Sequence, residues 1–336
     1  MPADPPDHRL PVSRRNRGAT ALVTLAVSLP SMVISGLLVY GAGTLGGPST
    51  ALGLTLTWLL VGPLIPPPTS DMAPLIFRVR RPRPEEQAML IPAWHNVAQL
   101  ARVSADDYSL WVQDTRDVNA LSAPGRIVAV TGWAIAALGP RELEAVLAHE
   151  LGHHLGGGQR AHMLAYWYGL PVALIRTGYR KITWLFAVFV AQAAHIVGFV
   201  ALLRLFGVRK AMDVICFAVL TPTRALVFVA AVIGAATMFA IPVAVIAAAA
   251  LLAEPFAKQA QRRWSEIRAD AVAVDLGYGQ QTHTVLDLWL RRVSTRREPG
   301  PLARLLDSHP PIETRLRAVR TRVGASGCVI PPPRSG

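Results

Sequence analysis

Charged residues are scarce in this sequence and unevenly spread. Asp, Glu, Lys and Arg make up 16% of the 336 residues, well below the about 25% that is usual for soluble domains. The hydrophobic fraction of 52% excludes a disordered chain. The interval from Gly18 to Ser70 contains no charged residue at all. Membrane spans are therefore the first feature to look for.

Cysteine is nearly absent as well. Cys216 and Cys328 are too few for a disulfide framework, and neither belongs to a Cys-x-x-Cys pair that would bind a metal. The net charge of +13 raises the question of nucleic acid. Its basic clusters, however, flank apolar runs, and no nucleic-acid-binding motif accompanies them. A lipid bilayer with anionic headgroups explains the charge more simply, and we expect no nucleic-acid partner.

Four nearly charge-free runs are long enough to cross a bilayer, whose core of about 30 Å needs about 20 apolar residues per helix. A Gly-rich stretch at 41–50 divides the interval 19–70 into two spans, which predicts a helical hairpin. The apolar run within 161–181 is shorter and carries His162, so we interpret it as a core or interfacial helix. The four predicted spans cover residues 20–40, 50–66, 182–203 and 225–253.

The basic residues predict an orientation. Segment 1–18 is rich in arginine, and four more arginines lie within 78–83, whereas the loop between the first two spans has none. By the positive-inside rule both flanks are cytoplasmic. The bias is smaller around the later spans, because basic residues also lie within 204–224. We expect a multi-pass protein of the cell membrane with a cytoplasmic catalytic half; a cleaved signal peptide is the alternative for the first span.

The more polar segments, 75–160 and 254–325, have the composition of a folded domain, and a Pro-rich tail follows at 326–336. Apolar spacing predicts an amphipathic helix over 85–103. Residues 110–112 and 126–131 are predicted strands, with 119–125 as the turn between them.

One predicted helix carries a metal-binding pattern. It begins at Gly139 and Pro140 and ends at the glycines 156–158. Within it, His149 and His153 lie one turn apart on the same face and can bind one metal ion. Glu150 lies beside that face, where it can accept a proton from water on the metal. The alternative is a polar helix turn without a metal.

A catalytic zinc site needs three protein ligands and one open position. The predicted helix that follows the fourth span offers Glu266 and, one turn later, Asp270. Glu266 would complete a two-histidine, one-glutamate site, and Asp270 could accept the second N–H of a ligand histidine. The alternative is a solvated acidic pair that balances the neighbouring arginines.

Several motifs in order resemble one family. LEAVLAHELGH, the later SEIRAD, the upstream NALSAPGRIVAVTGW and the downstream SHPPIETRLRAV are similar to the membrane zinc metallopeptidases that include HtpX and the CAAX prenyl protease. The resemblance implies one zinc ion (Zn2+) per chain on His149, His153 and Glu266, catalysis by Glu150, and support from Asp270. It also implies a mainly α membrane protein, with about four transmembrane helices and an α+β zincin-like domain that contains a small sheet.

Three further positions gain a meaning from the resemblance. His309 corresponds to a histidine that helps to stabilise the tetrahedral intermediate, and Arg315 to an arginine that follows it at the same spacing. Asn119 corresponds to an asparagine near the substrate-binding cleft. From the residues alone, 308–311 would be a helix start, Arg315 a solvated side chain and Asn119 a turn residue.

The expected activity is hydrolysis of peptide bonds, with proteins or peptides as substrates and the strand at 126–131 as a possible edge for pairing with them. The resemblance suggests partly misfolded membrane proteins and a role in membrane protein quality control. A processing protease with one dedicated substrate and a metallopeptidase-type membrane sensor are the alternatives. We expect His154 to be no ligand, because it points about 100° away from His153, and His195 to lie within the third span.

Overall fold

The computed structural model describes residues 14–66, 70–115, 120–196, 241–294 and 310–325, with a few isolated positions between 218 and 229. The chain divides into two compact units. The first comprises Met1–Val27, Pro63–Ala165 and Pro255–Gly336, and the second comprises Ser28–Gly62 and Tyr166–Glu254.

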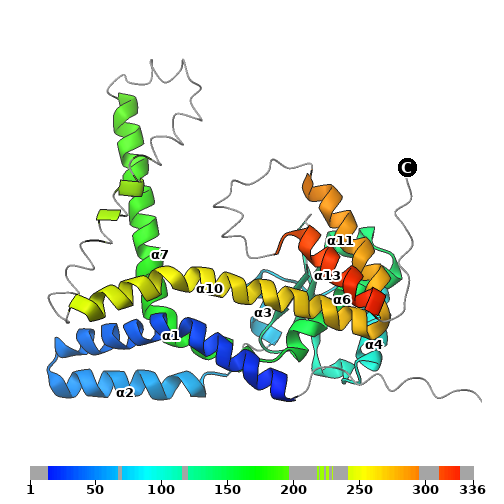
Figure 1. Ribbon diagram of the computed structural model, residues 1–336, viewed down its shortest axis with the longest axis horizontal. Helices are drawn as coiled ribbons and strands as arrows, with labels where there is room; N and C mark the ends of the chain where they lie inside the picture. Colours follow the sequence, from blue (N-terminus) through cyan, green and yellow to red (C-terminus); the bar gives the residue numbers. More distant parts are fainter. Residues whose placement is uncertain are drawn as a thin grey trace, which may run out of the picture. The chain divides into compact units, whose positions relative to one another are not determined.

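The first unit is mostly helical. The sequence predicted a helix over 85–103, which is confirmed as α4, and a helix that contains His149 and His153, which is confirmed as α6. Helices α11 and α13 lie side by side, beside the end of α10 (Figure 1). The helices that lie wholly or mainly in this unit are α3 (Ala73–Phe77), α4 (Pro84–Leu100), α5 (Gly132–Ala137), α6 (Pro140–Leu155), the second part of α10 (Ile241–Ala273), α11 (Gly279–Ser294) and α13 (Ile312–Ala325); short ends of three further helices also belong to it.

A glycine allows the sharp turn between α10 and α11. The helical path continues through a π-helical segment, Val274–Tyr278, in which Gly277 has a φ of 91°. A residue with a Cβ would be strained in this left-handed conformation. The turn brings α11 back toward α6, and the helix predicted to end at Gly277 does change direction there.

The first unit contains a three-stranded sheet whose order is β1–β3–β2. Strand β1 (Ser109–Gln113) pairs in parallel with β3 (Ile127–Thr131), and β2 (Ala120–Ala123) pairs antiparallel with β3. Two predictions were wrong. Residues 120–123 form a strand rather than part of a turn, and β3 is the central strand rather than an edge. The physical reason is burial, because all five residues of β3 are buried, which is typical of a strand covered on both faces.

Two apolar clusters cover the two faces of the sheet. On one face, Val112, Val128 and Val130 pack with Trp94 of α4 and Leu147 of α6. On the other face, Trp111, Ile127 and Ala129 pack with Ala73 and Val79. Burial of one large apolar side chain contributes about 1.5–3 kcal/mol. The sheet is therefore a rigid support for α6, whose other face carries the two histidines.

The second unit consists of long apolar helices. Helix α1 (Arg14–Thr44) and α2 (Pro48–Leu64) form the predicted hairpin, joined by a short turn. Tyr168 of α7 (Gln159–Ile196) donates its hydroxyl hydrogen to the carbonyl of Leu59, at a distance of 2.6 Å. Because Pro63 has no N–H to offer that carbonyl, the tyrosine supplies the missing hydrogen bond. Ser31 of α1 donates both its amide and its hydroxyl hydrogen to the buried carboxylate of Glu254.

Two helices in the described part of the chain are long and apolar enough to cross a membrane. They begin at Gly18 and at Ile241, and they contain the first predicted span and the end of the fourth. Helix α2 is apolar but has only 17 residues. Helix α7 runs without a break through 161–181 into the third predicted span. The remainder of the third span, most of the first part of the fourth and the side chain of His195 lie outside the described residues.

Candidate metal centre

Helix α6 presents two histidines toward one point. The rings of His149 and His153 lie 4.9 Å apart between centroids and are nearly perpendicular, with an interplanar angle of 89°. Leu147 and Leu151, on the opposite face of α6, are completely buried in the core. The spacing of one turn and the anchoring of the apolar face together fix the direction of both rings.

Glu266 of α10 faces both rings. Its Oε2 lies 3.6 Å from Nε2 of His149, and its Oε1 lies 3.4 Å from Nε2 of His153. Ligand atoms of a tetrahedral site with metal bonds of about 2.0–2.1 Å stand about 3.3 Å apart. The two distances are close to that separation. His149, His153 and Glu266 can therefore hold one metal ion.

The other ring nitrogens support this interpretation, because each faces a polar side chain of α10. Nδ1 of His149 lies 2.8 Å from Oδ1 of Asp270, although the ring N–H is not aligned well enough for a full hydrogen bond. Nδ1 of His153 lies 3.2 Å from the hydroxyl of Ser265. Partners of this kind fix the ring orientation and leave Nε2 to the metal.

Gly152 allows α10 to approach α6 this closely. A Cβ at this position would lie 2.9 Å from Cα and 3.0 Å from the carbonyl oxygen of Ala269. Both are backbone atoms of the helix that carries Glu266, so any larger residue must push that helix away. The glycine of the His-Glu-Leu-Gly-His motif is thus a packing requirement of the site.

Replacing Gly152 with alanine is expected to lower zinc affinity by at least tenfold, because it moves Glu266 away from the histidines. The overpacking should also cost about 1–3 kcal/mol of stability. Zinc titration and thermal unfolding measure the two effects. Gly324→Ala in α13 is the matched control, since no atom lies within 4 Å of its added Cβ. Unchanged zinc affinity in Gly152→Ala would contradict the packing argument.

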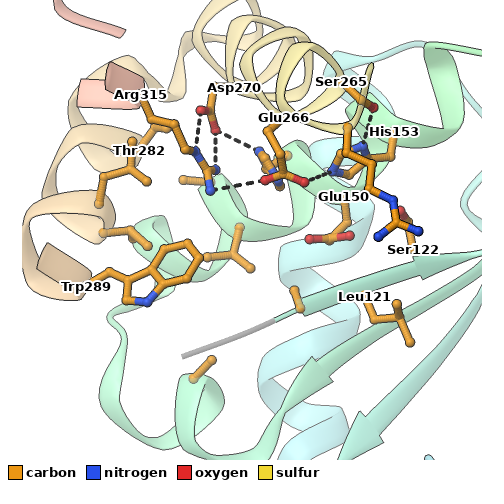
Figure 2. A pocket seen from close by; sticks show the side chains of 18 residues that line it. Leu121, Ser122, Glu150, His153, Ser265, Glu266, Asp270, Thr282, Trp289 and Arg315 are labelled. Atoms are coloured by element: carbon orange, nitrogen blue, oxygen red, sulfur yellow. Dashed lines mark hydrogen bonds and ion pairs between the residues drawn. The ribbon is translucent and has the colours of Figure 1, made fainter. Parts of the chain in front are cut away.

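A buried ion pair between Arg315 and Asp270 contacts two of the candidate ligands, His149 and Glu266. Arg315 of α13 is only 4% exposed and Asp270 only 1%. The guanidinium donates two hydrogen bonds to Asp270, both at 2.7 Å, and its Nη1 lies 3.1 Å from Glu266. Figure 2 shows Arg315 to the left of Glu266, with dashed lines from its guanidinium to Asp270 and Glu266. Burial alone would raise the pKa of Asp270, but His149 and Arg315 lower it to about 2.

The same charges act on His149. Burial alone would lower its pKa, but the carboxylates of Asp270 and Glu266 raise the pKa to about 10. Without a metal, His149 is therefore protonated at neutral pH, and its positive charge lies beside the buried carboxylate of Asp270 and the partly exposed carboxylate of Glu266. A metal ion that takes the place of this proton fits the charge of the site as well as its geometry.

Zinc binding near pH 7 is accordingly expected to release about one proton from His149. Because the folded-state pKa is raised to about 10, the proton is present below that pH, and zinc affinity should rise about tenfold per pH unit from pH 7 to 8. Calorimetric titrations in buffers of different ionisation enthalpy measure the proton. Asp270→Asn removes one of the charges that raise the pKa of His149, so zinc binding to this variant should release fewer protons. A binding enthalpy independent of the buffer would refute this expectation.

Glu150 shares a cavity with the ligand group. It is 5% exposed, follows His149 directly on α6, and lines a cavity of about 360 Å³ together with the two histidines and Glu266. Figure 2 shows its carboxylate facing the space below Glu266 and His153. Leu121 and Ser122 of the edge strand β2 line the same cavity. A carboxylate, a candidate metal site and the edge strand of the described sheet therefore meet in one place.

The structure brings most of the predicted site residues together: His149, Glu150, His153, Glu266, Asp270 and Arg315 all line this cavity. His309 and Asn119 lie outside the described residues. His154 is not in the possible ligand group. Its Nε2 lies 3.2 Å from the carbonyl oxygen of Ile127, and burial lowers its pKa to about 4.

Sequence reasoning missed several lining residues. Ser265 directly precedes Glu266, and this position next to a predicted ligand is the only feature of the sequence that marks Ser265. Thr282 and Trp289 of α11 also line the cavity. No local pattern marks them, because the turn at Gly277 decides which face of α11 meets α6.

Two histidines one turn apart on a helix, a carboxylate from a second helix and a glutamate beside them define a metallopeptidase-type site. The family model for peptidase family M48 matches residues 84–323, which include every residue of this site. The chain belongs to peptidase family M48, which implies metallopeptidase activity and a metal ion. The resemblance found in the sequence is thereby confirmed at the level of the family. None of the curated proteins compared with the chain matches it.

Proposed function

We propose that the protein is a membrane-associated, zinc-dependent endopeptidase. The observation that carries this proposal is the geometry of the site. The carboxylate oxygens of Glu266 lie 3.6 Å from Nε2 of His149 and 3.4 Å from Nε2 of His153, and Glu150 lines the same cavity. His149, His153 and Glu266 would hold the zinc, one ion per chain. When bound there, zinc lowers the pKa of a water molecule to about 7 and polarises the scissile carbonyl.

The remaining steps belong to residues of the chain. Glu150 takes the proton of the attacking water and passes it to the leaving amine. Asp270 holds the ring of His149, and Arg315 holds Asp270 and Glu266. This placement favours a positioning role for Arg315 over the direct substrate contact that the resemblance implies. The roles of His309 at the oxyanion and of Asn119 in the cleft rest on the resemblance alone.

The substrate backbone is proposed to add to the edge strand β2. Leu121 and Ser122 line the cavity, and within the described part of the chain β2 lies at the edge of the sheet, next to β3. An extended chain on the other side would gain main-chain hydrogen bonds that do not depend on its side chains. This corrects the strand chosen from the sequence but keeps the mode of binding.

The cellular setting is also a proposal. The apolar helices that begin at Gly18 and Ile241 support membrane association. A multi-pass arrangement in the cell membrane and a cytoplasmic site rest on the spans and arginines of the sequence. Partly misfolded membrane proteins as substrates, and a role in quality control, rest on the resemblance.

Zinc content and casein hydrolysis of the detergent-purified full chain test the proposed function. The wild type should hold about one zinc and cleave casein, and a chelator should abolish cleavage until zinc is restored. Glu266→Ala should lose both properties. Glu313→Ala, on the exposed face of α13, is the control and should keep both. A wild type that binds no zinc would refute the proposal, and one that binds zinc but cleaves no peptide would favour a sensor.

A further inference from the structure

The cavity extends beyond the metal centre into an apolar recess. One wall is α11, where Thr282, Val285, Leu286 and Trp289 follow the spacing of one helix face. Ala145 and Val146 of α6, about one turn before His149, line the recess as well. Figure 2 shows Thr282 and Trp289 on the side of the cavity opposite Leu121 and Ser122. The recess thus lies next to the position of a scissile bond.

Thr282 is the polar exception on this wall. It is 5% exposed, and its hydroxyl makes no hydrogen bond to any described residue. Thr284, two residues later on the exposed side of the same helix, donates its hydroxyl hydrogen to the carbonyl of Gln280 at 3.1 Å. The hydroxyl of Thr282 makes no such hydrogen bond to the carbonyl of the residue four positions earlier. Its neighbours Val285 and Leu286 have no polar side-chain atom to offer.

A buried hydroxyl without a partner is costly, and a ligand that pairs with it recovers that cost. A purely apolar ligand would leave the hydroxyl unpaired. A charged side chain would lose its hydration without finding an opposite charge on this wall. The guanidinium of Arg315 lies near Trp289, 5.5 Å from the centre of a ring, but it already contacts Asp270 and Glu266.

We propose that this recess is the specificity pocket for a substrate side chain beside the scissile bond, and that it selects an apolar side chain carrying one neutral hydrogen-bonding group, which Thr282 binds. Tyrosine and threonine have this chemistry; phenylalanine and valine do not. The inference rests on the proposed function, since it concerns the substrate of that site. The cavity of about 360 Å³ lies at the small end of ligand pockets, which hold about 300–1,000 Å³. Its size suits one side chain and the reacting peptide group.

Matched peptide pairs test the pocket. Each pair differs only in one hydroxyl, tyrosine against phenylalanine or threonine against valine, at each of the two positions that flank the scissile bond. In the zinc-loaded wild type, kcat/KM should favour the hydroxylated peptide about tenfold at one of these positions. Thr282→Val, which has nearly the same shape, should abolish that preference. Thr282→Ser should retain it, and Thr284→Val is the control that should behave as wild type.

Binding separates this inference from the proposed function. In the zinc-loaded Glu150→Gln variant, the dissociation constants of the same peptides should show the same preference, and adding Thr282→Val should remove it. If the wild type cleaves no peptide but Glu150→Gln binds the hydroxylated peptides more tightly, the proposed function fails and the pocket stands. If Thr282→Val changes cleavage and binding of both members of every pair by the same factor, the pocket proposal is overturned.

Discussion

Glu150→Gln is expected to abolish peptide hydrolysis while zinc remains bound. Glutamine has nearly the shape of glutamate but cannot accept the proton of the attacking water, and the loss of such a group costs about 10²–10⁴-fold in rate. The proposed ligand atoms belong to His149, His153 and Glu266, so the metal site should survive. Steady-state cleavage of a peptide and metal analysis of the same sample measure the two properties.

A matched control lies on the same helix. Glu142 is in the first turn of α6 and does not line the cavity, so Glu142→Gln should keep near wild-type activity. If Glu150→Gln loses its zinc together with its activity, Glu150 is part of the metal site. If it keeps both, another residue is the base.

Arg315→Met is expected to destabilise the protein by up to about 3–5 kcal/mol, because it removes the guanidinium that donates two hydrogen bonds to the buried carboxylate of Asp270 and leaves it with His149 alone from this group. Zinc affinity should also fall about 10–100-fold, because Asp270 and Glu266 both lose a contact that holds them in place. Denaturant unfolding of the metal-free protein and zinc titration measure these effects. Arg317→Met, an exposed position on the same helix, is the control and should be nearly neutral.

A second pair of variants separates positioning from charge. Arg315→Lys keeps the positive charge but cannot donate two parallel hydrogen bonds to Asp270. Compared with Arg315→Met, it should therefore regain more of the stability than of the zinc affinity. In Asp270→Asn/Arg315→Gln no unpaired charge remains at this pair, and the double variant should be more stable than Arg315→Met. Additive losses from the two single substitutions would show that the residues do not act as a pair.

The residues of the candidate metal site were predictable because their pattern is local. The spacing of His149 and His153 on one predicted helix, and of Glu266 and Asp270 on another, fixes which side chains share a face. That the two helices meet is not a local property. It depends on Gly152, whose small size the sequence shows but whose neighbour, Ala269, only the structure identifies.

The sheet was predictable only in part. Strands β1 and β3 are apolar runs, whereas β2 consists of Ala-Leu-Ser-Ala beside proline and glycine, a composition that also suits a turn. Strand order depends on pairing between distant residues, such as Val112 of β1 with Val130 of β3. No local pattern encodes that pairing. For the same reason no sequence pattern indicates that α11 lines the cavity.

If substrates add to β2 as proposed, the position of this strand at the edge of the described sheet has a consequence for which proteins can be cut. The strand has four residues, so it can pair with only a few residues of another chain, and that chain must already be extended. A segment held in a helix or in another sheet has its backbone groups occupied and cannot compete for this edge. Susceptibility to cleavage should therefore follow the local unfolding free energy of the substrate segment. A protein that frays beside a cleavable bond would be degraded, while its stably folded form with the same sequence would be spared.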